Sequence, residues 1–148
     1  MVILRETHQI DDTTQPTVGV GVIVIRNGKV LLGQRKGSHG EGTFGWPGGK
    51  LEYGESLHDA VKREALEEAG LQIRDCKLVC ISNVLDYDRH YLDVEFLVTE
   101  FTGDPIVREP ESTESWRWYR LDNLPDPLFR PCQLAIDSLK TSRLLNDS

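Results

Sequence analysis

Apolar residues recur along the chain with two different spacings, and the first of them predicts β-strands. From Val18 to Ile25, valine and isoleucine alternate with glycine in a pattern that is typical of a mostly buried strand. Asn27-Gly28 is a tight-turn sequence, so residues 29–32 are expected to return as the partner strand of a hairpin. Further strands are expected near residues 75–84, 90–101 and 115–120.

The second spacing, of three to four residues, predicts a helix over about residues 57–69. Ser56 is the expected N-cap and Asp59, three residues further on, is its acidic partner. Gly70 stands where a left-handed C-cap is expected. These signals together predict both ends of the helix.

Glycine and proline set the expected boundaries elsewhere. Residues 37–45 are rich in glycine, and the Trp46-Pro47-Gly48-Gly49 stretch is expected to lack regular structure and to let the backbone approach a ligand closely. Three prolines between residues 125 and 131 precede a short closing helix, expected over about residues 133–145. The apolar positions of this helix suit packing: Leu134, Leu139 and Leu144.

Three carboxylates share one face of the first helix. Glu64, Glu67 and Glu68 follow one another at helical spacing and continue the apolar stripe of Leu57 and Val61, so they are expected to point toward the body of the protein. A solvated charged face is the alternative, but it would lie opposite the apolar stripe. Hard divalent cations such as Mg²⁺ bind carboxylates, carbonyls and substrate phosphates. The pattern therefore predicts metal-assisted phosphate chemistry.

The segment from Gly49 to Leu71 resembles the Nudix box, G-x5-E-x7-R-E-U-x-E-E-x-G-U, in which U is a bulky apolar residue. Ala65 departs from the pattern, because it is small for its U position. The resemblance implies an α/β/α sandwich with a mixed central sheet and a strand-loop-helix motif. It also implies hydrolysis of a nucleoside diphosphate linked to another moiety, with Mg²⁺ or Mn²⁺ as the cofactor. The positions that match the box are Gly49, Glu55, Arg63, Glu64, Glu67, Glu68, Gly70 and Leu71.

The same resemblance implies roles for individual residues. The metal ligands are expected to be Glu64, Glu67, Glu68 and the Gly48 carbonyl. Arg63 is expected to orient these glutamates, although a surface pair with Glu67 is the alternative for that arginine. Structural support is expected from Gly49, Glu55 and Gly70.

The attacking water needs a carboxylate to take its proton. In the family this general base is either a box glutamate or an acid from a later loop. The segment 109–114 offers three glutamates, and among these we expect Glu111 to be the base. An ordinary acidic loop is the alternative for this segment.

Composition limits the class of protein. A length of 148 residues with 39% apolar content suits one domain, expected at residues 17–148 after an irregular segment at residues 1–16. The net charge of −7 argues against a polymeric nucleic-acid partner and favours a small metal-chelated anion. Three cysteines without metal-site spacing, and no leader or long apolar run, predict a cytoplasmic protein without a membrane partner.

A wider resemblance narrows the expected substrate. The segments LLGQRKGSHGEGTFGWPGGKLEYGES, EPESTESWRWYRLDNLP and DPLFRP resemble the MutT-like branch of small nucleoside triphosphate pyrophosphohydrolases. Members of that branch act on oxidised or modified purine nucleotides and release a nucleoside monophosphate and pyrophosphate, so a canonical or modified nucleoside triphosphate is the substrate expected here. Several of its members are homodimers, so a homodimer is an expectation here. Substrate contacts are expected from Phe44, Trp46, Phe129 and Arg130.

Other functions remain open at this point. Tyr87 lies where the family marker for diadenosine polyphosphate hydrolases falls, and relatives also act on NADH, dihydroneopterin triphosphate or prenyl diphosphates. A Nudix module that binds nucleotide without turning it over is a further alternative. The intact box glutamates favour an enzyme over such a module. His58 and His90 are assigned no role, because isolated histidines are more often structural or exposed.

Overall fold

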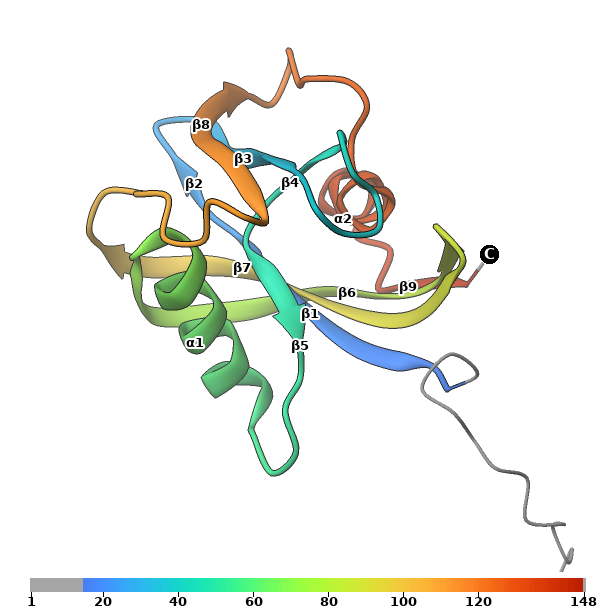
Figure 1. Cartoon of the computed structure of the whole chain (residues 1–148). Helices are drawn as coiled ribbons and strands as arrows, with labels where there is room; N and C mark the ends of the chain where they lie inside the picture. Colours follow the sequence, from blue (N-terminus) through green and yellow to red (C-terminus); the bar gives the residue numbers. More distant parts are fainter. Residues whose placement is uncertain (1–14, 148) are drawn as a thin grey trace, which may run out of the picture.

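A five-stranded mixed sheet forms the centre of the protein in the computed structural model, which describes residues 15–147 (Figure 1). The strands lie in the order β5-β1-β7-β6-β9, and the neighbouring pairs β1-β7 and β6-β9 are parallel whereas β5-β1 and β7-β6 are antiparallel. The expected irregular segment at residues 1–16 lies almost wholly outside the described residues. The bounds of the strands are β1 Thr17–Ile23, β5 Gly48–Lys50, β6 Gln72–Asp86, β7 Arg89–Thr102 and β9 Leu145–Asp147.

A smaller antiparallel sheet is formed by β2, β3, β4 and β8. Asn27 and Gly28 both have positive φ and make the tight turn between β2 and β3. β8 pairs with the other edge of β3 through most of its length. The bounds of the strands are β2 Ile25–Arg26, β3 Lys29–Arg35, β4 Phe44–Gly45 and β8 Thr113–Arg120.

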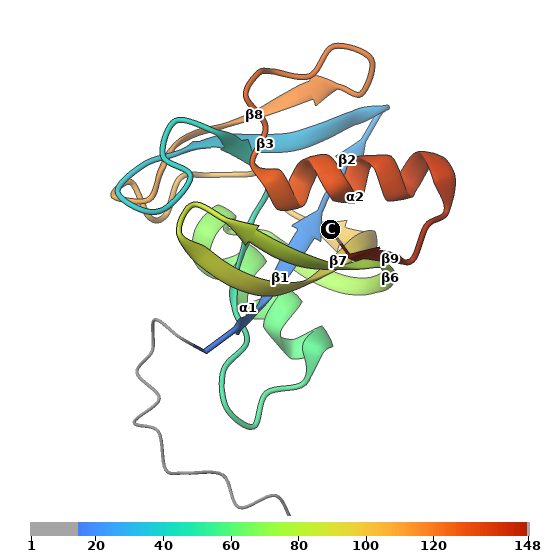
Figure 2. The ribbon, with the colours of Figure 1, turned by 90° about the vertical axis from the view of Figure 1, so that its right-hand side faces the viewer.

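The two helices cover opposite faces of the large sheet (Figures 1 and 2). α1 (Leu57–Ala69) packs against β1, β5 and β6, and α2 (Arg130–Thr141) packs against β6 from the other side. Each face has its own apolar core, because neighbouring strand residues point to opposite sides of a sheet. Val22 belongs to the core under α1, for example, and Ile23 belongs to the core under α2. The expected α/β/α sandwich is confirmed.

Local signals predicted α1 more accurately than they predicted the strands around it. The helix has the expected bounds, with Ser56 accepting a hydrogen bond from the Asp59 amide and Gly70 in the left-handed region at φ 68°. The hairpin prediction was partly wrong: the chain breaks at Val24, so β1 joins the large sheet and only the two residues of β2 pair with β3. The 46–49 stretch also contributes to a strand, β5, which pairs with β1.

The closing helix begins earlier than expected and ends earlier. α2 starts at Arg130 with Pro131 in its first turn, where the missing amide hydrogen of proline costs nothing. It ends at Thr141, so Leu144 lies outside the helix and is 55% exposed rather than packed. Neither helix of residues 15–147 has the length and apolar character needed to cross a membrane.

Candidate active site

Arg63 is the centre of the polar network on α1. Its Nε and Nη2 atoms donate to the two oxygens of Glu55 at 2.6 and 2.9 Å, and Nη2 also donates to the Lys50 carbonyl at 2.9 Å. Nη1 donates to Glu64 at 2.7 Å and to Glu67 at 3.2 Å. These hydrogen bonds, with those to Glu55 first, raise the pKa of Arg63. The arginine therefore ties α1 to the loop before it and holds two of the glutamates.

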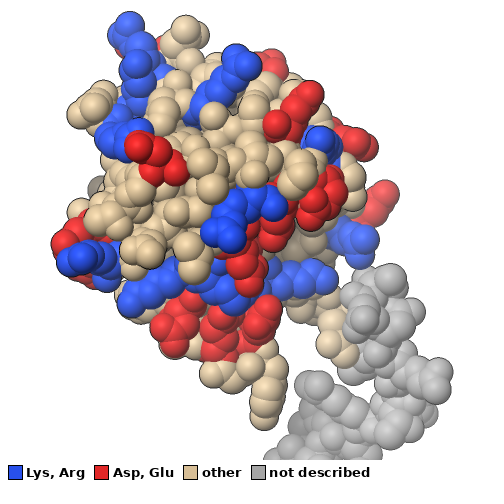
Figure 3. All heavy atoms as spheres, turned by 60° about the vertical axis from the view of Figure 1, so that its left-hand side comes forward, with Lys and Arg blue, Asp and Glu red and all other residues tan. Residues whose placement is uncertain are grey.

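Positive and negative side chains are interleaved on the protein surface as well. On the face shown in Figure 3, lysine and arginine side chains lie among aspartate and glutamate side chains. The net charge of −7 is therefore not gathered into a single acidic expanse on that face.

The three glutamates of α1 are not equally buried. Glu64 is buried, Glu68 is half-buried, and the Glu67 side chain is 47% exposed, so only two of the three point toward the body of the protein as expected. Burial raises the pKa of Glu64 and raises that of Glu68 well above its usual value. The charge of Glu64 adds to the effect on Glu68. Two carboxylates thus lie close together, and of the two only Glu64 is paired with Arg63.

β5 lies directly against these two carboxylates. The Gly48 amide donates to Glu68 Oε2 at 3.3 Å. A Cβ atom on Gly49 would stand only 2.4 Å from Glu64 Oε1, so the carboxylate fills the space above this glycine. The two glycines therefore serve packing: a side chain at position 49 would displace a glutamate of the site.

Within residues 15–147, no group of three or more histidine, cysteine, aspartate or glutamate side chains is arranged to hold a metal ion. The donor chemistry nevertheless fits a hard divalent cation, because Glu64 and Glu68 bring carboxylate oxygens together. Burial raises the pKa of both acids, and the charge of Glu64 raises that of Glu68 further. Glu67 lies one helical turn away from Glu64 and shares Arg63 with it.

The loop before β8 approaches the C-terminal end of α1. The amide of Arg108 and the indole of Trp116 both donate to the Glu68 carbonyl, at 3.3 and 3.1 Å. Glu109 in this loop is half-buried, and its charge contributes to the raised pKa of Glu68. Glu111, the expected general base, is exposed in the turn that follows. The acid of this loop that acts on the glutamate pair is therefore Glu109.

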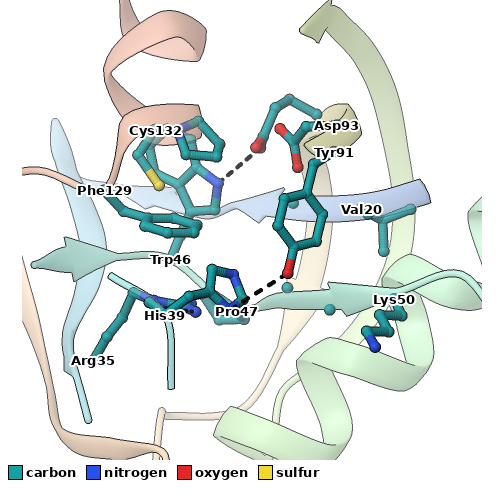
Figure 4. A pocket seen from close by; sticks show the side chains of 16 residues that line it. Val20, Arg35, His39, Trp46, Pro47, Lys50, Tyr91, Asp93, Phe129 and Cys132 are labelled. Atoms are coloured by element: carbon teal, nitrogen blue, oxygen red, sulfur yellow. Dashed lines mark hydrogen bonds between the residues drawn. The ribbon is translucent and has the colours of Figure 1, made fainter. Parts of the chain in front are cut away.

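A pocket of about 120 Å³ opens on the other side of β5 (Figure 4). Gly48, Gly49 and Lys50 line one wall, and the opposite wall is formed by residues around the start of α2, including Phe129 and Cys132. The volume is close to that of a cavity that admits one benzene ring, about 150 Å³. A planar ring is thus the kind of group that this pocket accommodates from its open side.

Two acids from β7, Asp93 and Glu95, line the pocket. Both side chains are buried, and the Trp46 indole donates to Glu95 Oε2 at 2.7 Å. Burial raises the pKa of Asp93 and raises that of Glu95 well above its usual value, and the charge of Asp93 adds to the shift of Glu95. Asp93 Oδ2 has no hydrogen-bond partner within the described part of the chain.

Space for these acids comes from two glycines on the neighbouring strand. In the parallel pairing of β1 and β7, Gly19 lies beside Asp93 and Gly21 lies beside Glu95. A Cβ atom on Gly21 would lie 1.9 Å from Glu95 Oε2, and one on Gly19 would lie 3.4 Å from Asp93 Oδ1. The glycines that alternate with valine in β1 are therefore the positions that make room for buried carboxyl groups.

Aromatic and cationic side chains surround the pocket mouth (Figure 4). His39 stacks on Tyr91 with ring centroids 5.0 Å apart, and the Arg35 guanidinium lies 3.9 Å from the centroid of the Phe129 ring. Burial and the nearby charge of Arg35 lower the pKa of His39 to about 4, so this imidazole is neutral at pH 7. Arg35 and Lys50 are the cations that line the pocket.

The structure separates the four residues expected to contact substrate. Trp46 and Phe129 line the pocket, whereas Phe44 packs edge-on against Tyr119 in the core and does not line it. Arg130 begins α2, and its side chain donates to Gln133 rather than facing the pocket.

The two histidines and the marker tyrosine have local partners. His90 forms a hydrogen bond of 2.7 Å with Asn83, and His58 is exposed beside Phe96. Tyr87 stacks on Phe129, and its hydroxyl accepts a hydrogen bond from the Arg130 amide at 3.0 Å.

Sequence reasoning missed most of the pocket. The acids Asp93 and Glu95 alternate with apolar residues in β7, a pattern that ordinarily indicates the wet face of a strand. The sequence feature that indicates the buried acids is the pair of glycines at positions 19 and 21, because glycine inside a buried strand often marks a close approach by another group. No role in the site was expected for Arg35 or His39, which lie in the LLGQRKGSHGEG segment that carries part of the family resemblance.

Comparison with known proteins agrees with this arrangement. The NUDIX domain model matches residues 15–136. The oxidized purine nucleoside triphosphate hydrolase of Mus musculus is 35% identical over 107 residues, which are 70% of this chain and 66%, just under two thirds, of that enzyme. The ADP-ribose pyrophosphatase of Methanocaldococcus jannaschii is 31% identical over 116 residues, 77% of this chain and 68% of that protein.

A solved structure also matches over most of its length. The crystal structure of a MutT NUDIX hydrolase from Burkholderia pseudomallei has a TM-score of 0.81 and 35% sequence identity, and the match covers 84% of this chain and 98% of that one. The family model, these relatives and the glutamate-bearing helix in its expected place all point to one assignment. The chain therefore belongs to the Nudix hydrolase family.

Proposed function

We propose that this protein hydrolyses nucleoside triphosphates, canonical or oxidised, to a nucleoside monophosphate and pyrophosphate with Mg²⁺ as cofactor. One observation carries the proposal: β5 borders both halves of the site, which are the pocket and the glutamates of α1. Gly48 and Gly49 line the pocket on one side and contact Glu68 and Glu64 on the other. A nucleotide with its base in the pocket would have its phosphates led across β5 to the glutamates.

The charges of the site suit a substrate of this shape. Arg35 and Lys50 line the pocket, on the way from its closed end to α1, where they would attract phosphate oxygens. The related mouse enzyme is named for oxidised purine nucleoside triphosphates, which supports the substrate class. The pocket volume of about 120 Å³ suits a base rather than a whole nucleotide.

Glu64, Glu67, Glu68 and the Gly48 carbonyl are the groups that would hold the metal. When bound, Mg²⁺ would neutralise charge on the phosphate oxygens and make an attacking water more acidic. Arg63 would fix the glutamate carboxylates through its donors to Glu64 and Glu67. In place of Glu111 we propose Glu109 as the general base, since its charge acts on Glu68 and its side chain is half-buried.

Substitution of Glu67 by glutamine tests the proposal. Because the side chain is 47% exposed, Glu67→Gln is expected to keep the fold and lower kcat by about a hundredfold or more through loss of a metal ligand. Products from a panel of nucleoside triphosphates, diadenosine polyphosphates, NADH and ADP-ribose are separated with Mg²⁺ present. The wild type should release monophosphate and pyrophosphate from the triphosphates.

Glu100→Gln is the matched control, because Glu100 is an exposed glutamate on β7 away from the pocket lining. It is expected to leave activity unchanged. Cleavage confined to dinucleotides or ADP-ribose would overturn the substrate class, whereas full activity of Glu67→Gln would overturn the metal-ligand assignment. Nucleotide binding without turnover would instead indicate a binding module.

A further inference from the structure

The closed end of the pocket contains an acid pair whose hydrogen bonding is incomplete. Asp93 Oδ2 is buried without a partner, while Glu95 Oε2 accepts the Trp46 indole hydrogen at 2.7 Å. Both acids line the pocket, and Figure 4 shows Asp93 on the same side as Tyr91, above the space that the labelled side chains enclose. No lysine or arginine within residues 15–147 forms an ion pair with either acid.

We propose that Asp93 and Glu95 hold one proton between them and read the base of the substrate, selecting a guanine-type edge with two adjacent N–H donors. This inference rests on the proposed nucleotide substrate. It adds the base preference and the residues that set it.

Sharing of a proton follows from how the two acids are packed. Asp93 and Glu95 are two residues apart in β7 and so share one face of the sheet, beside Gly19 and Gly21 of β1, where the charge of Asp93 raises the pKa of Glu95. Two carboxylates that lie this close in a buried site cannot both stay ionised. Cys80 and Cys132 are the other titratable groups near Glu95, and burial keeps both thiols neutral.

The surroundings decide which acid carries the proton. Glu95 is 1% exposed and lies deeper, whereas Asp93 is 8% exposed. A neutral Glu95 would accept from Trp46 with one oxygen and donate its proton to Asp93 with the other, which provides a partner for the unpaired Oδ2 atom. Asp93 then remains a carboxylate, and its Oδ1 atom, which lies beside Gly19 in the pocket lining, can accept hydrogen bonds from a ligand.

A carboxylate accepts hydrogen bonds and cannot donate them. At the end of a narrow pocket it therefore favours bases that present N–H donors. Guanine offers N1–H and the exocyclic amino group on one edge, and hypoxanthine keeps N1–H but lacks the amino group. Adenine offers an acceptor at N1, which would face the carboxylate unfavourably. Since a hydrogen bond to a charged group is among the stronger ones, the guanine-to-hypoxanthine preference is expected to be about tenfold or more.

Binding of GMP, IMP and AMP, measured by titration calorimetry without metal, tests the preference apart from catalysis. Wild type is expected to bind GMP about tenfold more tightly than IMP, and AMP more weakly still. Asp93→Asn should bring the GMP-to-IMP ratio close to one. Glu95→Gln should retain the ratio, because its amide can accept from Trp46 and donate to Asp93. The control Glu100→Gln changes an exposed carboxylate on the same strand and should match wild type.

Two results would overturn the inference while the proposed hydrolysis stands: equal affinity of wild type for the three monophosphates, or an unchanged ratio in Asp93→Asn. Failure of every triphosphate in the product assay would remove the proposed function itself. Infrared spectroscopy gives a readout that does not depend on folding of the Asp93 variant. The difference between the spectra of wild type and Glu95→Gln at neutral pH should contain the band of one protonated carboxyl group, and absence of that difference band would contradict proton sharing.

Discussion

At the scale of single residues, both halves of the site depend on a glycine that leaves room for a carboxyl group. The Glu64 carboxylate lies over Gly49, and the Glu95 carboxyl lies over Gly21. The two cases differ in how freely the acid can move. Glu64 is 6% exposed on α1 beside Arg63, whereas Glu95 is 1% exposed at the end of the pocket. Substitution by alanine is therefore expected to lower the free energy of unfolding less at Gly49 than at Gly21.

Alanine at Gly48 and at Gly49 separates packing from function. A Cβ at position 48 would lie 2.5 Å from the Val20 carbonyl oxygen, a backbone atom, and at position 49 it would meet only the end of the Glu64 side chain. Gly48→Ala is expected to lower the free energy of unfolding by about 1–3 kcal/mol. Gly49→Ala should be nearly as stable as wild type but much less active.

Urea unfolding and steady-state hydrolysis measure the two effects on the same samples. A Gly49→Ala variant with normal activity would show that the position of Glu64 is unimportant for hydrolysis. Equal stability of the two variants would show that β5 can move away from β1 without cost.

The box residues could be predicted from the sequence because their spacing on one helix determines which side they share. Arg63 and Glu67 are examples, since a spacing of four residues is enough to bring them to the same part of α1. Asp93 could not be predicted in the same way. Its role depends on pairing with a distant strand, and its alternation with apolar neighbours is also typical of an exposed strand face.

At the scale of elements, the capping residues were sufficient to predict α1. The sheet that each strand joins could not be predicted from the sequence. Ser56 and Gly70 determined α1 because a helix cap involves only neighbouring residues. The break at Val24 sends one apolar run into two different sheets, and nothing in the alternation of valine and isoleucine indicates it. β5 was missed because Gly48 and Gly49 have low strand propensity, which packing against α1 and β1 overrides.

Tyr87 joins two elements, the β6-β7 hairpin and the start of α2. Its hydroxyl satisfies the Arg130 amide, one of the first amides of a helix that lack a partner within the helix. Tyr87→Phe is therefore expected to lower the free energy of unfolding by about 0.5–1.5 kcal/mol and leave kcat/KM for nucleoside triphosphates nearly unchanged. Chemical denaturation and hydrolysis assays measure both. A selective loss of diadenosine polyphosphate cleavage would instead make Tyr87 a substrate-binding residue.

At the scale of the whole molecule, the acid pair connects substrate recognition with stability. Burial and the charge of Asp93 raise the pKa of Glu95 well above its usual value of 4.5, so the folded protein binds more protons at this residue than the unfolded chain does. The stability that Glu95 contributes is therefore largest at low pH. It is lost as pH rises above 4.5 toward the folded-state pKa.

Replacement of Glu95 by glutamine should remove this pH dependence. Between about pH 5 and about pH 8, wild type is expected to lose more of its free energy of unfolding than Glu95→Gln does. Denaturation midpoints measured across this range, with Glu100→Gln as the reference, show the difference in slope. Parallel curves for wild type and Glu95→Gln would mean that Glu95 titrates normally in the folded protein.

The parallel register of β1 and β7 also has a consequence for how such a protein changes over generations. Gly21 cannot acquire a side chain while Glu95 occupies the adjacent space, and a shorter residue at position 95 would release that restriction. Positions far apart in the sequence are thereby obliged to vary together. A lineage in which Glu95 is replaced would be expected to show paired replacements across the two strands, with α1 unchanged.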